Sequence, residues 1–75
     1  MSKFILTDRE EKLLLLIAEG LSHHEITTEL HIGYRAVDRL ERDLCTRMGA
    51  KNTPNLIALA YHRGILTPMT DGIVT

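Results

Sequence analysis

The chain has 75 residues, of which 44% are hydrophobic and 25% are charged, and its formal net charge is −1. These values predict one small globular domain and exclude a disordered chain. No apolar run approaches the ~20 residues of a membrane span, and a single cysteine, Cys45, excludes a disulfide framework. The first residues lack the order of a signal peptide, so we expect a cytoplasmic protein that contacts no membrane.

The first predicted helix begins at the capping box Thr7-Asp8-Arg9-Glu10, whose first and last side chains each accept from the other residue's backbone amide. We expect this helix to reach about Glu19 and to end at Gly20 in the left-handed conformation. Its buried stripe is expected to contain Leu13, Leu14, Ile17 and Ala18, widened by Leu15 and Leu16. The residues expected to fold back on the core before it are Phe4, Ile5 and Leu6.

A second capping box, Ser22-His23-His24-Glu25, opens a short helix from Glu25 to Leu30. Ile26 and Leu30 are four residues apart and are expected to face inward. The pair His23-His24 is expected to be a solvated helix start. The turn is His31-Ile32-Gly33, in which the glycine stands where the next helix needs its N-cap residue.

The longest predicted helix follows, ends at Gly49, and has two distinct faces. At ~100° per residue, four apolar side chains lie within ~60° of the first of them, Val37. These are Val37, Leu40, Leu44 and Met48, and the opposite side carries Arg35, Arg39, Arg42 and Thr46. Three guanidinium groups in a row predict an anionic ligand. The alternative is a solvated face with ion pairs four residues apart. Those pairs would be Arg39 with Asp43 and Asp38 with Arg42.

The charges are unevenly distributed along the chain. Residues 1–33 carry six acidic and three basic side chains, whereas residues 34–63 carry six basic and three acidic ones. Such polarity is typical of a protein with one side that faces an anion.

A fourth helix is predicted with Thr53 as its N-cap, Pro54 in the first helical position and Gly64 at its end. It is apolar at Leu56, Ile57, Leu59, Ala60 and Tyr61. Because this is more than one face of a short helix needs, part of it is expected to meet a partner. Ile65 and Leu66 are expected to tuck against the core.

Together these elements predict an all-α domain over residues 1–66, followed by a polar tail over residues 67–75. A short helix, a turn containing glycine and a longer helix with an exposed polar face form the pattern of a helix-turn-helix. With one helix before it and one after it, the expected fold is a four-helix bundle-like domain around a central helix-turn-helix, without a wing.

A set of residues at fixed spacing runs through these elements: Leu6-Thr7, Arg9-Glu10, Leu14, Ile17-Ala18, Gly20-Leu21-Ser22, Glu25-Ile26, Leu30, Ile32, Val37, Leu44, Arg47-Met48-Gly49, Asn52 and Ala58. With them, the chain resembles the C-terminal DNA-binding domain of LuxR/GerE-type bacterial transcription regulators, which the FixJ and NarL response regulators share. The resemblance covers about residues 5–66.

The chain departs from this family's pattern at the start of the long helix. The family usually has Ser, then Thr-Val-Lys-x-His. The serine, threonine, lysine and histidine are here Gly33, Ala36, Asp38 and Leu40, and the family's arginine after this helix is Thr53. The lysine commonly points into the major groove, where an aspartate would repel phosphates. The residues that remain to replace these contacts are Arg35, Arg39 and Arg42.

The resemblance implies a stand-alone transcription regulator that binds double-stranded DNA with the long helix in the major groove. Arg39 and Arg42 are then placed for base edges. Arg35 and Tyr34 are placed for phosphate or a flanking base. Further predicted DNA contacts are Ser22, His23, His24, Thr46, Arg47 and Lys51. Relatives dimerise through the fourth helix, which predicts a homodimer interface with Leu56, Ile57, Leu59, Ala60 and Arg63.

A second hypothesis is a protein-interaction module that has kept the fold, lost operator binding, and modulates a full-length LuxR-type regulator by pairing with it or blocking it. Asp38 and Glu41, expected on the flank of the recognition face, favour this hypothesis, whereas the arginine row argues against it. An enzyme, a metal site and a cofactor are not expected, because the four histidines and Cys45 lack ligand spacing. Cys45 is expected to be half buried.

Overall fold

Four helices make up the fold in the computed structural model, which describes residues 5–67. They are α1 (Asp8–Ala18), α2 (His23–Leu30), α3 (Tyr34–Met48) and α4 (Thr53–His62), and the described range contains no strand. The predicted all-α class is therefore confirmed. The expectations for Phe4 and for the tail over residues 68–75 lie outside the described residues.

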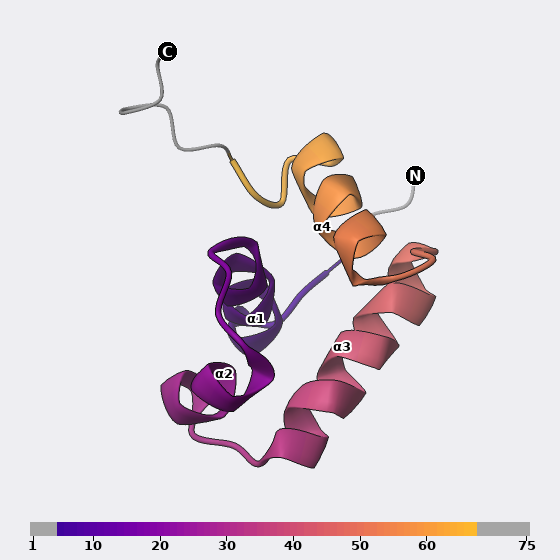
Figure 1. Ribbon diagram of the computed structural model, residues 1–75. Helices are drawn as coiled ribbons and strands as arrows, with labels where there is room; N and C mark the ends of the chain where they lie inside the picture. Colours follow the sequence, from indigo (N-terminus) through magenta and orange to yellow (C-terminus); the bar gives the residue numbers. More distant parts are fainter. Residues whose placement is uncertain (1–4, 68–75) are drawn as a thin grey trace.

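The longest helix, α3, organises the arrangement of the others (Figure 1). It runs alongside α2 at its beginning and meets α4 near its end, while α1 contacts all three other helices. No helix within residues 5–67 is both long and apolar enough to span a bilayer.

Both predicted capping boxes are formed, and they explain where α1 and α2 begin. The amide of Glu10 donates to the Thr7 hydroxyl at 3.1 Å, and the amide of Thr7 donates to the Glu10 carboxylate at 3.0 Å. The same reciprocal pair joins Ser22 and Glu25, at 3.1 Å and 2.8 Å. Each box satisfies two donors that the first helical turn leaves free. Because Ser22 caps the helix, α2 begins at His23, two residues before the predicted start.

The predicted cap of α4 was wrong by one residue. Asn52 is the N-cap, because its side-chain oxygen accepts from the amide of Asn55 at 2.9 Å, and Thr53 is the first helical residue. The Thr53 hydroxyl has a different partner, since it donates to the Glu41 carboxylate. Gly33 caps α3 as predicted, without a side-chain hydrogen bond.

The ends of α1, α3 and α4 follow the glycine signals, whereas α2 ends at His31 with a φ of 58°. Gly20 has a φ of 92°, and its amide donates to the carbonyl of Ile17 at 2.9 Å, while Leu21 donates to Leu16 at 3.1 Å. This pair of bonds is a Schellman motif, and its left-handed residue is best accommodated by glycine. The chain can therefore turn sharply from α1 into α2 after a single connecting leucine.

Within residues 5–67, ten apolar side chains are buried in the core, contributed by all four helices and by Leu66 after α4. The largest fully buried ones are Leu13, Leu14, Ile26, Leu44, Leu56 and Val37. Ile65 is partly buried, so residues 65 and 66 tuck in as predicted.

Two predictions about the apolar residues of the first 20 positions were wrong. Leu15 is 45% exposed, whereas Leu16 is buried, because Leu15 lies about 200° from Leu13 around the helix and so faces away from the core. Ile5 is 86% exposed, since it lies outside the capped helix start, and only Leu6 of the described lead packs against the core.

Candidate nucleic-acid interface

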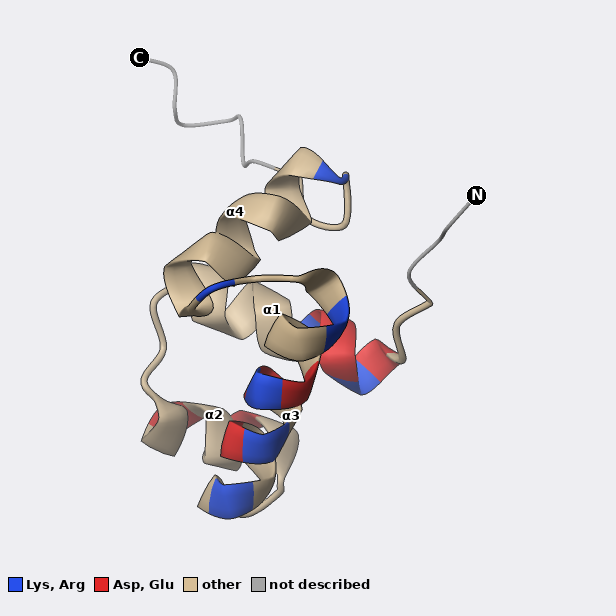
Figure 2. Ribbon diagram, turned by 90° about the vertical axis from the view of Figure 1, so that its right-hand side faces the viewer, with Lys and Arg blue, Asp and Glu red and all other residues tan. Residues whose placement is uncertain are grey.

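The helix-turn-helix unit consists of α2, residues 31–33 and α3, and α3 has the two faces that its sequence predicts. Val37 and Leu44 have no exposed area, Met48 is buried and Leu40 is partly buried, so this face joins the core. The opposite face is exposed, at Arg35, Arg39, Arg42 and Thr46. Figure 2 shows Lys and Arg alternating with Asp and Glu along α3, whereas α4 carries none of these four residue types.

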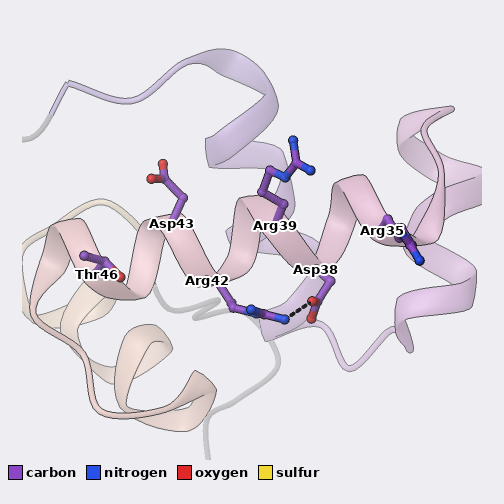
Figure 3. A pocket seen from close by; sticks show the side chains of 6 residues that line it. All are labelled: Arg35, Asp38, Arg39, Arg42, Asp43 and Thr46. Atoms are coloured by element: carbon purple, nitrogen blue, oxygen red, sulfur yellow. Dashed lines mark hydrogen bonds and ion pairs between the residues drawn. The ribbon is translucent and has the colours of Figure 1, made fainter.

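A shallow groove follows this exposed face, lined by Arg35, Asp38, Arg39, Arg42, Asp43 and Thr46. In Figure 3, Arg39 and Asp43 point to one side of the helix, and Asp38 and Arg42 point to the other. Three cationic and two anionic groups therefore lie within four helical turns, and the anions stand on the two flanks.

One of the two predicted ion pairs on this face is present and the other is wrong. Arg42 Nη2 donates to Asp38 Oδ2 at 2.8 Å. Asp43 contacts Arg47 at 3.3 Å instead of Arg39. Within the part of the chain that the structure describes, Arg35 and Arg39 form no ion pair and no side-chain hydrogen bond. Their guanidinium donors are free to meet a ligand without breaking a contact inside the protein.

Arg47, a predicted DNA contact, is held by the body of the protein. Its Nη1 and Nη2 atoms donate to the two carboxylate oxygens of Glu10 at 3.0 Å and 3.2 Å, which joins α3 to α1. Glu10 is 7% exposed, so one carboxylate both completes the cap of α1 and binds the guanidinium in a bidentate pair. Lys51 is exposed, and its backbone amide is held by the side chain of Asn55.

The expectation that Glu41 lies on the flank of the recognition face was wrong. This residue is 7% exposed, and its two carboxylate oxygens accept from His23 Nε2 and from the Thr53 hydroxyl. One acid thereby connects the beginnings of α2 and α4 to the middle of α3. The sequence contained a partial signal for this, because Glu41 lies ~40° from Val37 on the helical wheel, at the edge of the apolar arc.

The same contact corrects the interpretation of His23 as part of a solvated helix start. The His23 side chain is 29% exposed, and its ring meets that of Tyr34 edge-on, with the centroids 5.4 Å apart. Its neighbours Ser22 and His24 are exposed. Of this predicted group, two residues remain open to a ligand and one is directed into the protein.

Cys45 is partly buried, as predicted. Burial raises the pKa of its thiol above the ordinary value, and the nearby Glu41 carboxylate raises it further. Because the thiolate is the reactive form, this environment disfavours a nucleophilic role. Among the described residues, no group of three or more His, Cys, Asp or Glu side chains is arranged to hold a metal ion.

On α4, the structure changes the predicted dimer interface. Leu56 and Ala60 have no exposed area, because they face the protein's own core, so they cannot contact a partner. Ile57 and Leu59 are partly buried, and Arg63 is exposed. Two further residues of α4, Ala58 and Tyr61, are exposed, the second with 39% of its area, and neither belongs to the predicted interface set.

Comparison with known proteins identifies a family of bacterial regulators. The family model described as bacterial regulatory proteins, luxR family, matches residues 4–60. The oxygen regulatory protein NreC of Staphylococcus aureus strains JH9, JH1 and Mu3 is in each case 32% identical over 62 residues. The match covers 83% of this chain and 29% of NreC, so the chain spans less than a third of these relatives' length. No solved structure matches the chain significantly.

Proposed function

This chain belongs to the luxR family of bacterial regulatory proteins, whose helix-turn-helix domains bind DNA, and we propose that it does so by inserting α3 into the major groove. The observation that carries this proposal is the exposed arginine row on α3, in which Arg35 and Arg39 have no partner among the described residues. Free guanidinium groups on an exposed helix face match the anionic backbone and the guanine edges of a duplex.

Within this proposal, the predicted contacts divide into residues that read base edges, residues that meet the backbone or a flanking base, and residues that orient α3. Arg39 and Arg42 read base edges, and Arg35 with Tyr34 meets phosphate or a flanking base. Four exposed residues are assigned to contacts with the sugar-phosphate backbone: Ser22 and His24 at the beginning of α2, and Thr46 and Lys51 near the end of α3. His23 and Arg47 act differently, because their side chains bind Glu41 and Glu10 and so fix the orientation of α3.

The test is selection of binding sites from random duplex DNA by the purified chain, followed by titrations at 50 and 200 mM salt, concentrations at which phosphate contacts differ in strength. We expect one enriched sequence and a loss of affinity of about tenfold or more at the higher concentration. Failure of the folded protein to bind any duplex at low salt would overturn the proposal. Capture of a full-length LuxR-type regulator by such a protein would then support the interaction-module hypothesis.

We also propose that the chain forms a homodimer through α4, which would give a two-fold symmetric operator. In support, α4 carries no charged residue of the Lys, Arg, Asp or Glu type. Its outer face presents Ile57, Ala58 and Tyr61, of which the last two are exposed. Apolar and aromatic side chains on an uncharged helix face are the composition found at the centre of dimer interfaces.

The variant Ala58→Glu is expected to weaken this dimer, with a dissociation constant raised about tenfold or more, because a charge would be buried between the subunits. Ala58 is exposed, so the fold itself is not affected. Sedimentation velocity over a concentration series measures the effect. Thr28→Glu, at an exposed position on α2, is the matched control and is expected to dimerise normally. Equal dimerisation of the two variants would contradict the assignment.

This function requires no catalysis, metal or cofactor, and we propose none. Three further predictions from the sequence stay predictions: action as a stand-alone regulator, a cytoplasmic location, and the domain limit at residue 66. Immunoblotting of cell extracts for the length and location of the protein tests the first two.

A further inference from the structure

The ion pair between Asp38 and Arg42 lies on the surface that would face DNA. The two side chains are 40% and 77% exposed, and both line the groove along α3 (Figure 3). An unpaired carboxylate there would be repelled by phosphates. With Arg42 Nη2 only 2.8 Å from Asp38 Oδ2, the pair carries no net charge and can approach the duplex.

The pair also presents a defined pattern of hydrogen-bonding groups. Among the described residues, no group other than Arg42 bonds the Asp38 carboxylate, so Oδ1 remains an acceptor. Arg42 uses Nη2 and keeps further N–H donors. An acceptor and a set of donors therefore stand side by side, one helical turn apart, on one flank of the exposed face of α3.

We propose that Asp38 and Arg42 together read one C·G base pair in the major groove, with Asp38 accepting from cytosine N4 and Arg42 donating to guanine. This inference rests on the proposed function, since it names the base pair that the recognition helix selects. A C·G pair is complementary to the ion pair, because its major-groove edge offers the N4 donor of cytosine beside the O6 and N7 acceptors of guanine.

The other bases fit the carboxylate less well. Thymine presents the O4 acceptor and guanine presents two acceptors, which repel a carboxylate. Adenine offers an N6 donor, but its N7 acceptor lies next to it. Arg42 is in addition held in place by Asp38 before binding, which reduces the side-chain entropy lost when it meets guanine.

The other flanking acid, Asp43, provides a matched control. It lines the same groove and is half exposed, but its partner is Arg47, which is itself bound to Glu10 on α1. Asp43 therefore belongs to the contact between helices. Removing either acid deletes one negative charge from the lining of the same groove, so any general electrostatic gain in affinity is expected to be alike.

The experiment uses the site selected by the wild-type chain and replaces each of its cytosines in turn with 2-pyrimidinone, which lacks only the N4 amino group. At one position per half-site, this change is expected to lower the affinity of the wild-type chain and of Asp43→Ala about fivefold or more. Asp38→Ala is expected to lose less than about twofold at that position, because the acceptor is already absent. Circular dichroism confirms that both variants are folded.

Two results overturn the inference while leaving the proposed function intact. In one, the wild-type chain tolerates 2-pyrimidinone at every cytosine of a specific site. In the other, Asp38→Ala is as sensitive as the wild-type chain at the critical cytosine. Absence of any DNA binding by the wild-type chain is a different result, and it overturns the proposed function together with this inference.

Discussion

The Glu41→Ala variant is expected to unfold at a lower urea concentration than the wild-type chain, with its free energy of unfolding reduced by about 2 kcal/mol. The alanine removes two hydrogen bonds to a charged acceptor, one from His23 and one from Thr53. Part of this loss is offset because a carboxylate only 10% exposed no longer has to be desolvated. Urea titration followed by circular dichroism measures the change.

Two further variants separate the contribution of the two Glu41 hydrogen bonds from the effects of lost side-chain volume and of removing an acid from the protein. Glu41→Leu keeps most of the packing but removes the acceptor of His23 and Thr53, so it is expected to lose about 1 kcal/mol through the two broken hydrogen bonds alone. Glu29→Ala removes an exposed acid from α2 and is expected to change stability by less than about 0.5 kcal/mol. Equal stability of Glu41→Ala and Glu29→Ala would remove the connecting role from Glu41.

The signals that predicted the helices correctly are those that act within a few residues. Thr7 with Glu10, and Ser22 with Glu25, are three positions apart and close their capping boxes whatever the rest of the chain does. Gly20 and Gly49 end their helices with positive φ angles for the same local reason. Such elements depend on backbone donors and acceptors that lie next to one another, so the sequence is sufficient to place them.

The contacts that sequence reasoning missed join distant positions. Glu41 meets His23 and Thr53, which are 18 and 12 positions away, and Glu10 meets Arg47 across 37 positions. A helical wheel describes one helix and contains no information about what packs against it. It placed the arginine row on the exposed face correctly, but it cannot tell a buried acid with partners from an acid at the edge of that face.

The wrong ion pair on α3 has a related cause. Asp43 has an arginine four positions away on either side, at Arg39 and at Arg47, and the spacing rule does not choose between them. In the structure Asp43 pairs with Arg47, whose guanidinium is already held by Glu10. This pair costs less side-chain entropy than a pair with Arg39, because Arg47 is already fixed in place. In α4 the problem is similar, because both faces are apolar and the pattern alone does not indicate which one meets the core.

Arg39→Ala is expected to weaken binding to the selected operator by about 1–3 kcal/mol and to relax the preference at one base pair. Arg39 is exposed on the outward face of α3 and has no partner within the described residues. The substitution therefore removes hydrogen bonds to DNA and changes no contact inside the protein. Fluorescence anisotropy titrations with the selected site and with each single-base variant of it measure both effects.

The variants Arg39→Lys and Arg9→Ala decide whether such a loss reflects base reading or charge. Lysine keeps the charge but not the planar fork that donates twice to guanine, so Arg39→Lys is expected to keep the salt dependence and lose the base preference. Arg9→Ala removes an exposed arginine from α1 and is expected to change affinity by less than about twofold at moderate salt. If Arg39→Lys retained the base preference, or if Arg9→Ala weakened binding as much as Arg39→Ala, Arg39 would act on the duplex through its charge alone.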